Sequence, residues 1–169
     1  MSTEARVSLW SYALDRYTRP GSEADCLYLQ DEHGWDICEL LWIAWLSERA
    51  RRPDPATSEA LQAARRWQRE MTEPLRERRR QLKRDALEHP RLESLRQTIK
   101  QAELYAEREM LTRLEALPSL ETEGGSPLER ALTTCRELRQ IPADAYPTLR
   151  RLLARWTIGS SDAEPKTTC

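Results

Sequence analysis

The chain contains no Phe, only five Gly in 169 residues, and no apolar run of the roughly 18 residues that a membrane span needs. Charged residues make up 33% and hydrophobic residues 39%, which is typical of a helix-rich protein rather than a disordered chain or a β-sandwich. This length allows one substantial core with an appendage. We therefore predict an all-α protein, a bundle of about six to seven helices.

Signals of export and of redox chemistry are also lacking. The first six residues do not show the charged-then-apolar layout of a secretory signal, so we expect a cytoplasmic protein. No two of the four cysteines form a Cys-x-x-Cys pair, and in a reducing compartment all four are expected to be thiols. No known catalytic or cofactor signature occurs, so we predict no cofactor and favour a non-enzymatic protein.

Large aromatic residues concentrate near the start, where four of the six Trp lie. Apolar spacing predicts a helix over Val7 to Tyr17, which Pro20-Gly21 breaks, and a second over Ser22 to Asp31. The third predicted helix, Trp35 to Arg51, is apolar on nearly all sides. We expect this third helix to lie at the centre of the core.

The order of residues in this first block is distinctive over Leu9 to Leu46. Its defining positions are Trp10, Ala13, Leu14, Tyr17, Pro20-Gly21, Cys26-Leu27, Leu29-Gln30-Asp31, Gly34, Asp36-Ile37, Leu40-Leu41 and Trp45. In these positions the chain resembles a small family of uncharacterised proteobacterial proteins, the domain of unknown function 2390. The resemblance implies that the block is one unit, and it implies no activity.

Charge is uneven along the chain although the formal net charge is only -1. Met1 to Glu48 carries three Lys and Arg against nine Asp and Glu, whereas Arg49 to Glu115 carries 17 against 12. Such asymmetry indicates either a partner-binding surface or two oppositely charged elements that pack together.

The basic middle segment predicts two long helical arms. Apolar residues at spacings of three and four continue across Pro74, so either one helix kinks there or Thr72 caps a new one. A long helix follows from about Leu92 to Leu117. Narrow apolar stripes on both arms predict an antiparallel helical hairpin, residues 53–117, that projects from a globular body.

The remainder of the chain is expected to complete that body. Residues 118–125 read as a linker, and Ser126 with Glu129 forms the sequence pattern of a capping box. Two helices then follow, over Pro127 to Gln140 and Asp144 to Trp156. We expect residues 1–52 with 126–158 to form the helical body, and residues 159–169 to form a disordered polar tail.

The turn between the second and third predicted helices is the best candidate for a polar site, because a turn between core helices can direct several side chains to one point. Its candidate residues are Gln30, Asp31, His33, Trp35 and Asp36. Asp31 or Asp36 beside His33 could make an acid–base pair. A structural interpretation is favoured, in which Asp31 ends one helix, Gly34 supplies a positive φ and Asp36 caps the next helix.

A zinc site built from Cys26, His33 and Cys38 is a further interpretation of the same region. The spacing Cys-x6-His-x4-Cys is not that of a known structural zinc site. A Cys on an apolar helix face more often behaves as a small hydrophobic residue, so we predict no metal.

A second candidate surface is basic. It consists of Arg76, Arg78, Arg79, Arg80, Lys83 and Arg84. Phosphate contact is one interpretation. A solvated face, paired with glutamates of the other arm, is favoured because no aromatic residues interleave with the cations for base stacking.

The six Trp are too many to be buried completely in a core of this size. We expect Trp10, Trp42 and Trp45 to be core residues, and Trp35 and Trp67 to be exposed. Trp67 could stack on an Arg.

Three hypotheses about function remain. The first is a non-enzymatic cytoplasmic protein that binds a protein partner, with no membrane role. The second is an RNA- or ribosome-associated factor that uses the Arg-rich arm. The third is an enzyme or small-ligand-binding protein that uses the Gln30 to Asp36 turn.

Overall fold

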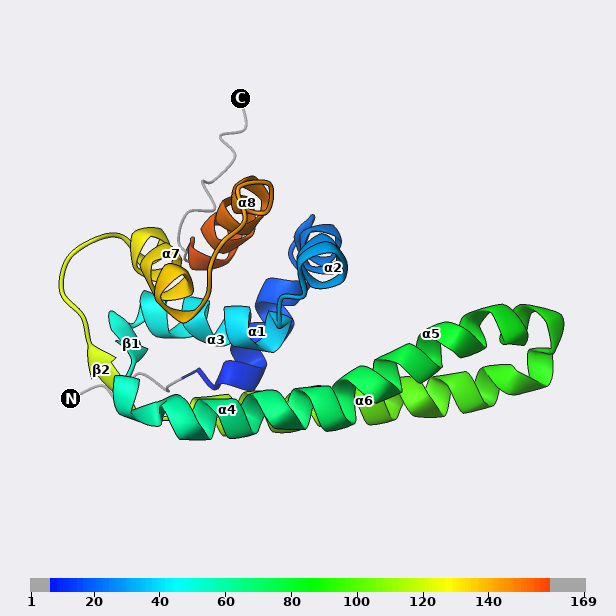
Figure 1. Cartoon of the computed structure of the whole chain (residues 1–169). Coiled ribbons are helices and arrows are strands. Elements are labelled where there is room, and N and C mark those ends of the chain that lie inside the picture. Colours follow the sequence, from blue (N-terminus) through cyan, green and yellow to red (C-terminus); the bar gives the residue numbers. More distant parts are fainter. Residues whose placement is uncertain (1–6, 159–169) are drawn as a thin grey trace, which may run out of the picture. The chain divides into compact units, whose positions relative to one another are not determined.

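A computed structural model describes residues 7–158 and divides the chain into two compact units (Figure 1). The first, called the body, comprises the chain up to Pro53 and from Ser119 onward; the second, the hairpin unit, runs from Asp54 to Pro118. Helices make up most of residues 7–158, where the only β structure is one two-stranded sheet. The all-α prediction is confirmed, whereas the expected tail, 159–169, lies outside the described residues.

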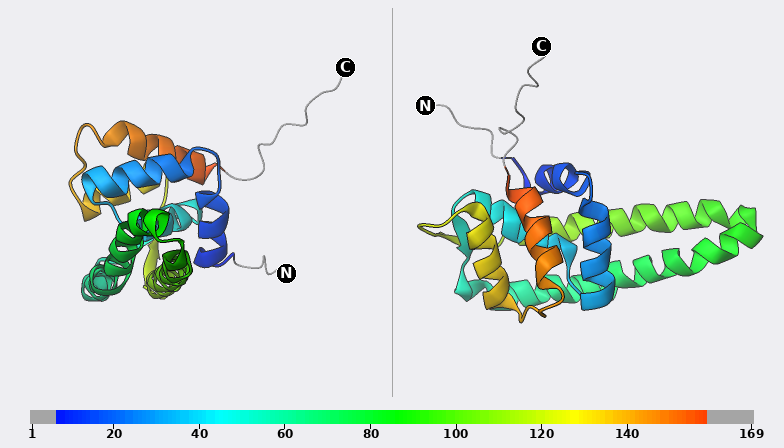
Figure 2. Two further views of the ribbon diagram at one scale, coloured as in Figure 1. Left: turned by 90° about the vertical axis from the view of Figure 1, so that its right-hand side faces the viewer. Right: turned by 90° about the horizontal axis from the view of Figure 1, so that it is seen from above.

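Within residues 7–158 the α-helices of the body are α1 (Leu9–Tyr17), α2 (Ser22–His33), α3 (Ile37–Glu48), α7 (Pro127–Leu138) and α8 (Tyr146–Thr157). Helix α3 is the centre, as predicted, because it contacts α1, α7 and α8 and is buried throughout residues 40–47. It is shorter than expected, since Asp36 caps it and Ala50, with a positive φ of 51°, follows its end. Helices α2 and α8 run side by side (Figure 2).

Arginine side chains hold the C-terminal end of α8. The Nε of Arg16 donates to the carbonyl oxygen of Trp156 at 2.7 Å, and Nη1 of Arg19 donates to that of Arg155 at 2.6 Å. In return, the indole N–H of the fully buried Trp156 donates to the carbonyl oxygen of Arg16. The last carbonyls of α8 thus find cationic donors, which the helix dipole also favours.

Helix α8 is fixed to α2 by a half-buried ion-pair cluster. Asp25 accepts hydrogen bonds from Arg151 at 2.6 Å and Arg155 at 2.8 Å. Burial alone would raise the pKa of Asp25, but these two guanidinium groups outweigh it and hold the pKa below its ordinary value. Gly21 is required beside this cluster, because its φ is 85° and a Cβ would come within 2.8 Å of the Arg155 guanidinium.

The short sheet closes the body. Strand β1 (Arg51–Pro53) pairs antiparallel with β2 (Ser119–Glu121), and Arg51 donates to the side-chain and main-chain oxygens of Ser119. The prediction of a plain linker over residues 118–125 was therefore wrong for its first half. The pairing partner of β2 lies 68 residues earlier in the chain, and local sequence carries no signal of it.

The hairpin unit begins with a 3₁₀ turn, η1 (Pro55–Thr57), and continues through α4 (Ser58–Trp67), η2 (Gln68–Thr72), α5 (Glu73–Glu88), η3 (Pro90–Leu92) and α6 (Glu93–Glu115). Helices α5 and α6 lie antiparallel against each other (Figure 1). None of the helices in residues 7–158 has the length and the hydropathy that crossing a bilayer requires.

Pro74 is accommodated by a π-helical turn rather than by a new helix start. In η2 the N–H of Glu73 donates to the carbonyl oxygen of Gln68, five residues earlier. Thr72 keeps helical dihedral angles and caps nothing, so α4, η2 and α5 form one continuous helix. The wider turn relieves the contact that a proline ring makes with the carbonyl group four residues before it.

Candidate functional site

The turn between α2 and α3 has the geometry of two capped helix ends. Gly34, with φ at 63°, donates its N–H to the carbonyl oxygen of Gln30, and the N–H of Trp35 reaches that of Leu29. The Asp36 carboxylate accepts the N–H of Glu39 at 3.1 Å, as the capping interpretation predicted. Helix α2 continues past Asp31 to His33, so Asp31 does not end it.

Arg139, from the connection between α7 and α8, clamps this turn. Its guanidinium donates to the carbonyl oxygens of His33 at 3.0 Å and Gly34 at 3.2 Å, and lies 4.3 Å from the centre of the Trp35 ring. Trp35 is consequently buried, with 5% of its surface exposed, and the prediction of an exposed Trp35 was wrong. Sequence analysis missed Arg139 because a distant loop supplies it.

His33 has a different carboxylate neighbour from those expected. Its Nε2 lies 3.2 Å from the Tyr28 hydroxyl and 3.8 Å from a carboxylate oxygen of Asp144. The structure thus places Tyr28, His33 and Asp144 together, whereas Asp36 serves as a cap. This Tyr–His–Asp cluster contains no Ser or Cys nucleophile.

The neighbouring cysteines do not supply one. Cys26 and Cys38 are buried, and burial is the main cause that raises the pKa of Cys26 to about 12. This thiol stays protonated at neutral pH and is poorly suited to nucleophilic attack or to metal binding. Within residues 7–158 no group of three His, Cys, Asp or Glu side chains is arranged to hold a metal ion.

The basic residues of α5 divide between two roles. Arg76 pairs with Glu103 at 3.1 Å and with Glu107 at 2.9 Å, and Arg79 pairs with Glu103 at 2.5 Å. Both cations therefore belong to the contact between the hairpin arms. Arg78 donates to Gln81 on its own helix.

The remaining cations of α5 share one exposed face. Arg80, Lys83 and Arg84 recur at helical spacing with Leu87, and we call these four residues the basic stripe. Leu87 exposes 82% of its surface. Among residues 7–158 no acidic side chain pairs with Lys83 or Arg84.

The hairpin unit as a whole is close to neutral. From Asp54 to Pro118 there are 14 Lys and Arg against 12 Asp and Glu, a net charge of +2. Arg49, Arg51 and Arg52, which contribute to the basic middle of the sequence, belong to the body. The basic stripe is therefore a local feature, not part of a broad positive field.

Among known proteins, the chain matches the model of one family. The sequence profile of a family described as a protein of unknown function (DUF2390) matches residues 8–114. The chain belongs to this family. No curated protein and no solved structure matches the chain.

The family match contains both the Gln30 to Asp36 turn and the basic stripe, and it extends well beyond the first block on which the resemblance was based. It ends before α7 begins. A third feature, which sequence analysis did not identify, lies in that later part of the chain.

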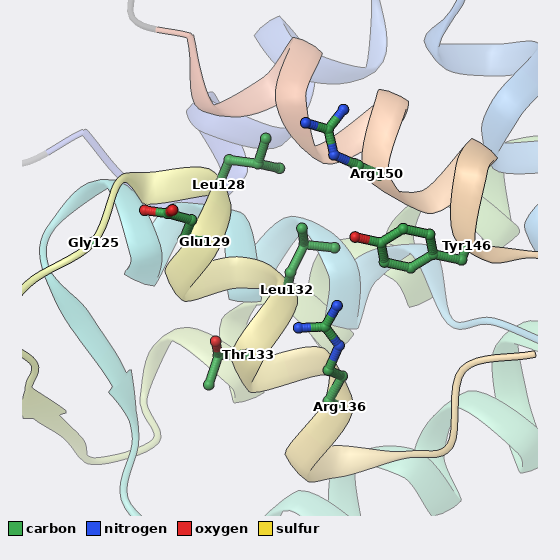
Figure 3. A pocket seen from close by; sticks show the side chains of 8 residues that line it. All are labelled: Gly125, Leu128, Glu129, Leu132, Thr133, Arg136, Tyr146 and Arg150. Atoms are coloured by element: carbon green, nitrogen blue, oxygen red, sulfur yellow. The ribbon is translucent and has the colours of Figure 1, made fainter. Parts of the chain in front are cut away.

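A groove of about 460 Å³ lies between α7 and α8 of the body (Figure 3). Leu128, Leu132 and Arg136 follow one face of α7, and Tyr146 and Arg150 lie one turn apart on α8. The spacing of four between these residues was a usable signal for two shared faces. That the faces meet could only come from the packing of α7 on α8.

Proposed function

We propose that this member of the DUF2390 family is a non-enzymatic protein of the bacterial cytoplasm that acts by binding another protein through its hairpin unit. The observation that supports this most directly is the basic stripe. Its cations share an exposed helix face with Leu87, which exposes 82% of its surface and gives the stripe an apolar contact point. A protein with an acidic surface and an apolar contact point would match it.

A protein partner fits the hairpin unit better than RNA does. Base stacking needs accessible aromatic rings near the cations. The ring of Trp67 is covered by the Arg113 guanidinium at 4.4 Å, and its N–H is used by the carbonyl oxygen of Ala106. Two of the six cations of α5 are paired to Glu103, and the hairpin unit as a whole carries a net charge of only +2, which is a weak field for a phosphate backbone.

A catalytic role has weaker support at the α2–α3 turn. Asp36 and Trp35 serve in capping and packing, and the groups beside His33, Tyr28 and Asp144, include no Ser or Cys nucleophile. The turn therefore favours a structural role.

The test is affinity purification of tagged protein from its host, comparing the wild type with the double charge reversal Lys83→Glu/Arg84→Glu. The matched control is Arg66→Glu/Arg69→Glu, which makes the same charge change at two other exposed positions of the hairpin unit. We expect a specific protein to co-purify with the wild type and the control, and to be lost from the stripe variant.

Three outcomes would contradict the proposal. The first is repeated recovery of the protein alone, and the second is a partner that all three proteins retain equally. The third is co-purification that ribonuclease abolishes, which would support the RNA-associated function instead. Cell fractionation checks the proposed location.

A further inference from the structure

The groove between α7 and α8 is lined by both apolar and positively charged side chains. Leu128 and Leu132 give it an apolar wall on α7, and Arg136 stands at the end of the same face. In Figure 3 the Tyr146 ring reaches from α8 toward α7, with Arg136 on one side and Arg150 on the other. The guanidinium of Arg136 lies 5.6 Å from the centre of that ring.

The two arginines of the groove differ from most others of the body. Arg16, Arg130 and Arg139 each donate to main-chain carbonyl oxygens, and Arg151 pairs with a carboxylate. By contrast, neither Arg136 nor Arg150 makes a hydrogen bond or an ion pair within residues 7–158. Two exposed guanidinium groups on one concave surface therefore retain all their hydrogen-bond donors for a ligand.

Among residues 7–158, Glu129 is the acidic residue that lines the groove, and its carboxylate is already hydrogen-bonded. Glu129 accepts the N–H of Ser126 at 2.6 Å and completes the capping box of α7. It stands seven residues before Arg136, about 10 Å along the helix axis. The positive end of the groove is therefore distinct from its acidic end, and the leucines lie along the same helix face.

We propose that this groove binds a small organic anion in which a carboxylate or phosphate group is joined to a short apolar part. Arginine forks match the oxygens of either group in two parallel hydrogen bonds. The Tyr146 hydroxyl supplies a further donor, and Leu128 and Leu132 cover the apolar part. The volume of about 460 Å³ is within the range of small-molecule sites and too small for a folded partner.

Isothermal titration calorimetry on the full chain, with octanoate and octyl phosphate as probes and 1-octanol as the uncharged control, tests this site. We expect at least one anionic probe to bind and the alcohol to bind more weakly. Arg136→Gln and Arg150→Gln should each lower the affinity for that probe by about tenfold or more, because each removes charge-assisted hydrogen bonds. Tyr146→Phe, which keeps the ring, should lower it by a smaller factor.

Arg66→Gln is the control, since it removes an exposed cation from the hairpin unit outside the basic stripe and leaves the groove intact. Circular dichroism establishes that each variant is folded, and two independent Arg variants keep the test valid if one of them fails to fold. Absence of binding by both anionic probes would overturn the proposal. So would equal losses in Arg66→Gln and Arg136→Gln, or binding to phosphatidic acid vesicles but not to the soluble probes. The site lies in the body, so these results are independent of the hairpin experiment.

Discussion

The body and the hairpin unit use arginine in different ways. In the body, several guanidinium groups donate to main-chain carbonyl oxygens, as Arg16 does to Trp156 and Arg130 does to Ser47, in addition to the ion pairs at Asp25. In the hairpin unit, Arg76 and Arg79 instead meet a carboxylate on the facing helix. Arginine thus satisfies main-chain oxygens as well as carboxylates in the body, whereas Arg76 and Arg79 of the hairpin unit pair with carboxylates across the two arms.

The two units also differ in what their cores bury: aromatic side chains in the body and a charged pair in the hairpin unit. The body buries whole aromatic side chains, with Trp42 and Trp156 fully inaccessible. In the hairpin unit, by contrast, a charged side chain is buried between α5 and α6: Glu103, which pairs with Arg76. From this difference we expect the body to respond most to lost volume, and the hairpin unit to respond most to lost charge pairing.

The largest effect should come from Trp156→Ala. It removes a fully buried indole and both of its hydrogen bonds, to Arg16 and Ser22, so we expect a loss of about 3–5 kcal/mol in the free energy of unfolding. The half-buried Trp67→Ala of the hairpin unit should lose less, about 1–2 kcal/mol. Urea unfolding followed by circular dichroism measures both, and equal losses would remove the distinction between the two cores.

One substitution made in both units tests how each uses arginine. Arg16→Lys should cost about 2–3 kcal/mol, because a lysine cannot reach the Trp156 carbonyl oxygen and Glu48 together. Arg79→Lys should cost about 0.5–1 kcal/mol, because an ammonium can still pair with Glu103 at a less buried position. The same denaturation experiment compares them, and a larger loss for Arg79→Lys would reverse the comparison.

Acid should weaken the body through Asp25. Its pKa lies below the ordinary value, so the charged form stabilises the folded state above about pH 4, and this contribution is lost as the pH falls through the folded-state pKa. Asp25→Asn should therefore lower stability by about 1–2 kcal/mol at pH 7 and hardly change it at pH 2. Urea unfolding at both pH values measures this, and a stability difference between Asp25→Asn and the wild type that is the same at pH 7 and pH 2 would contradict this account.

The smallest effect on the free energy of unfolding should come from Thr72→Val, and it should be a gain rather than a loss. The Thr72 hydroxyl is buried in η2 and has no hydrogen-bond partner within residues 7–158, so Thr72→Val removes a desolvated polar group and preserves the side-chain shape. We expect a gain of about 0.5–1 kcal/mol. A loss of stability would show that this hydroxyl has a bonding role, for example to a buried water.

Several features followed from local sequence. The Ser126 capping box, the Asp36 cap and the positive φ of Gly34 were predicted, because each depends on residues within four positions of one another. The central place of α3 followed from its composition. Of the predicted core tryptophans, Trp42 and Trp45 are buried, as expected, whereas Trp10 is only half-buried.

The incorrect predictions involve distant residues. Trp35 was expected to be exposed because its neighbours in sequence are polar, but Arg139 covers it from more than 100 residues away. The neighbour of His33 is Asp144 for the same reason. Trp67 stacks on an Arg, as expected, but that Arg is Arg113 on the opposite arm, and Trp67 is half-buried rather than exposed.

By itself the sequence determined the helical class, the ends of several helices and the amphipathic arms, because hydrogen bonding and apolar periodicity in a helix act over three to five residues. The tertiary structure decided which arginines are used and which remain available. Arg76 and Arg79 turn to α6, whereas Arg136 and Arg150 find no acceptor within residues 7–158. A guanidinium group bonds to whatever oxygen the fold brings within about 3 Å, and that is a property of packing rather than of composition.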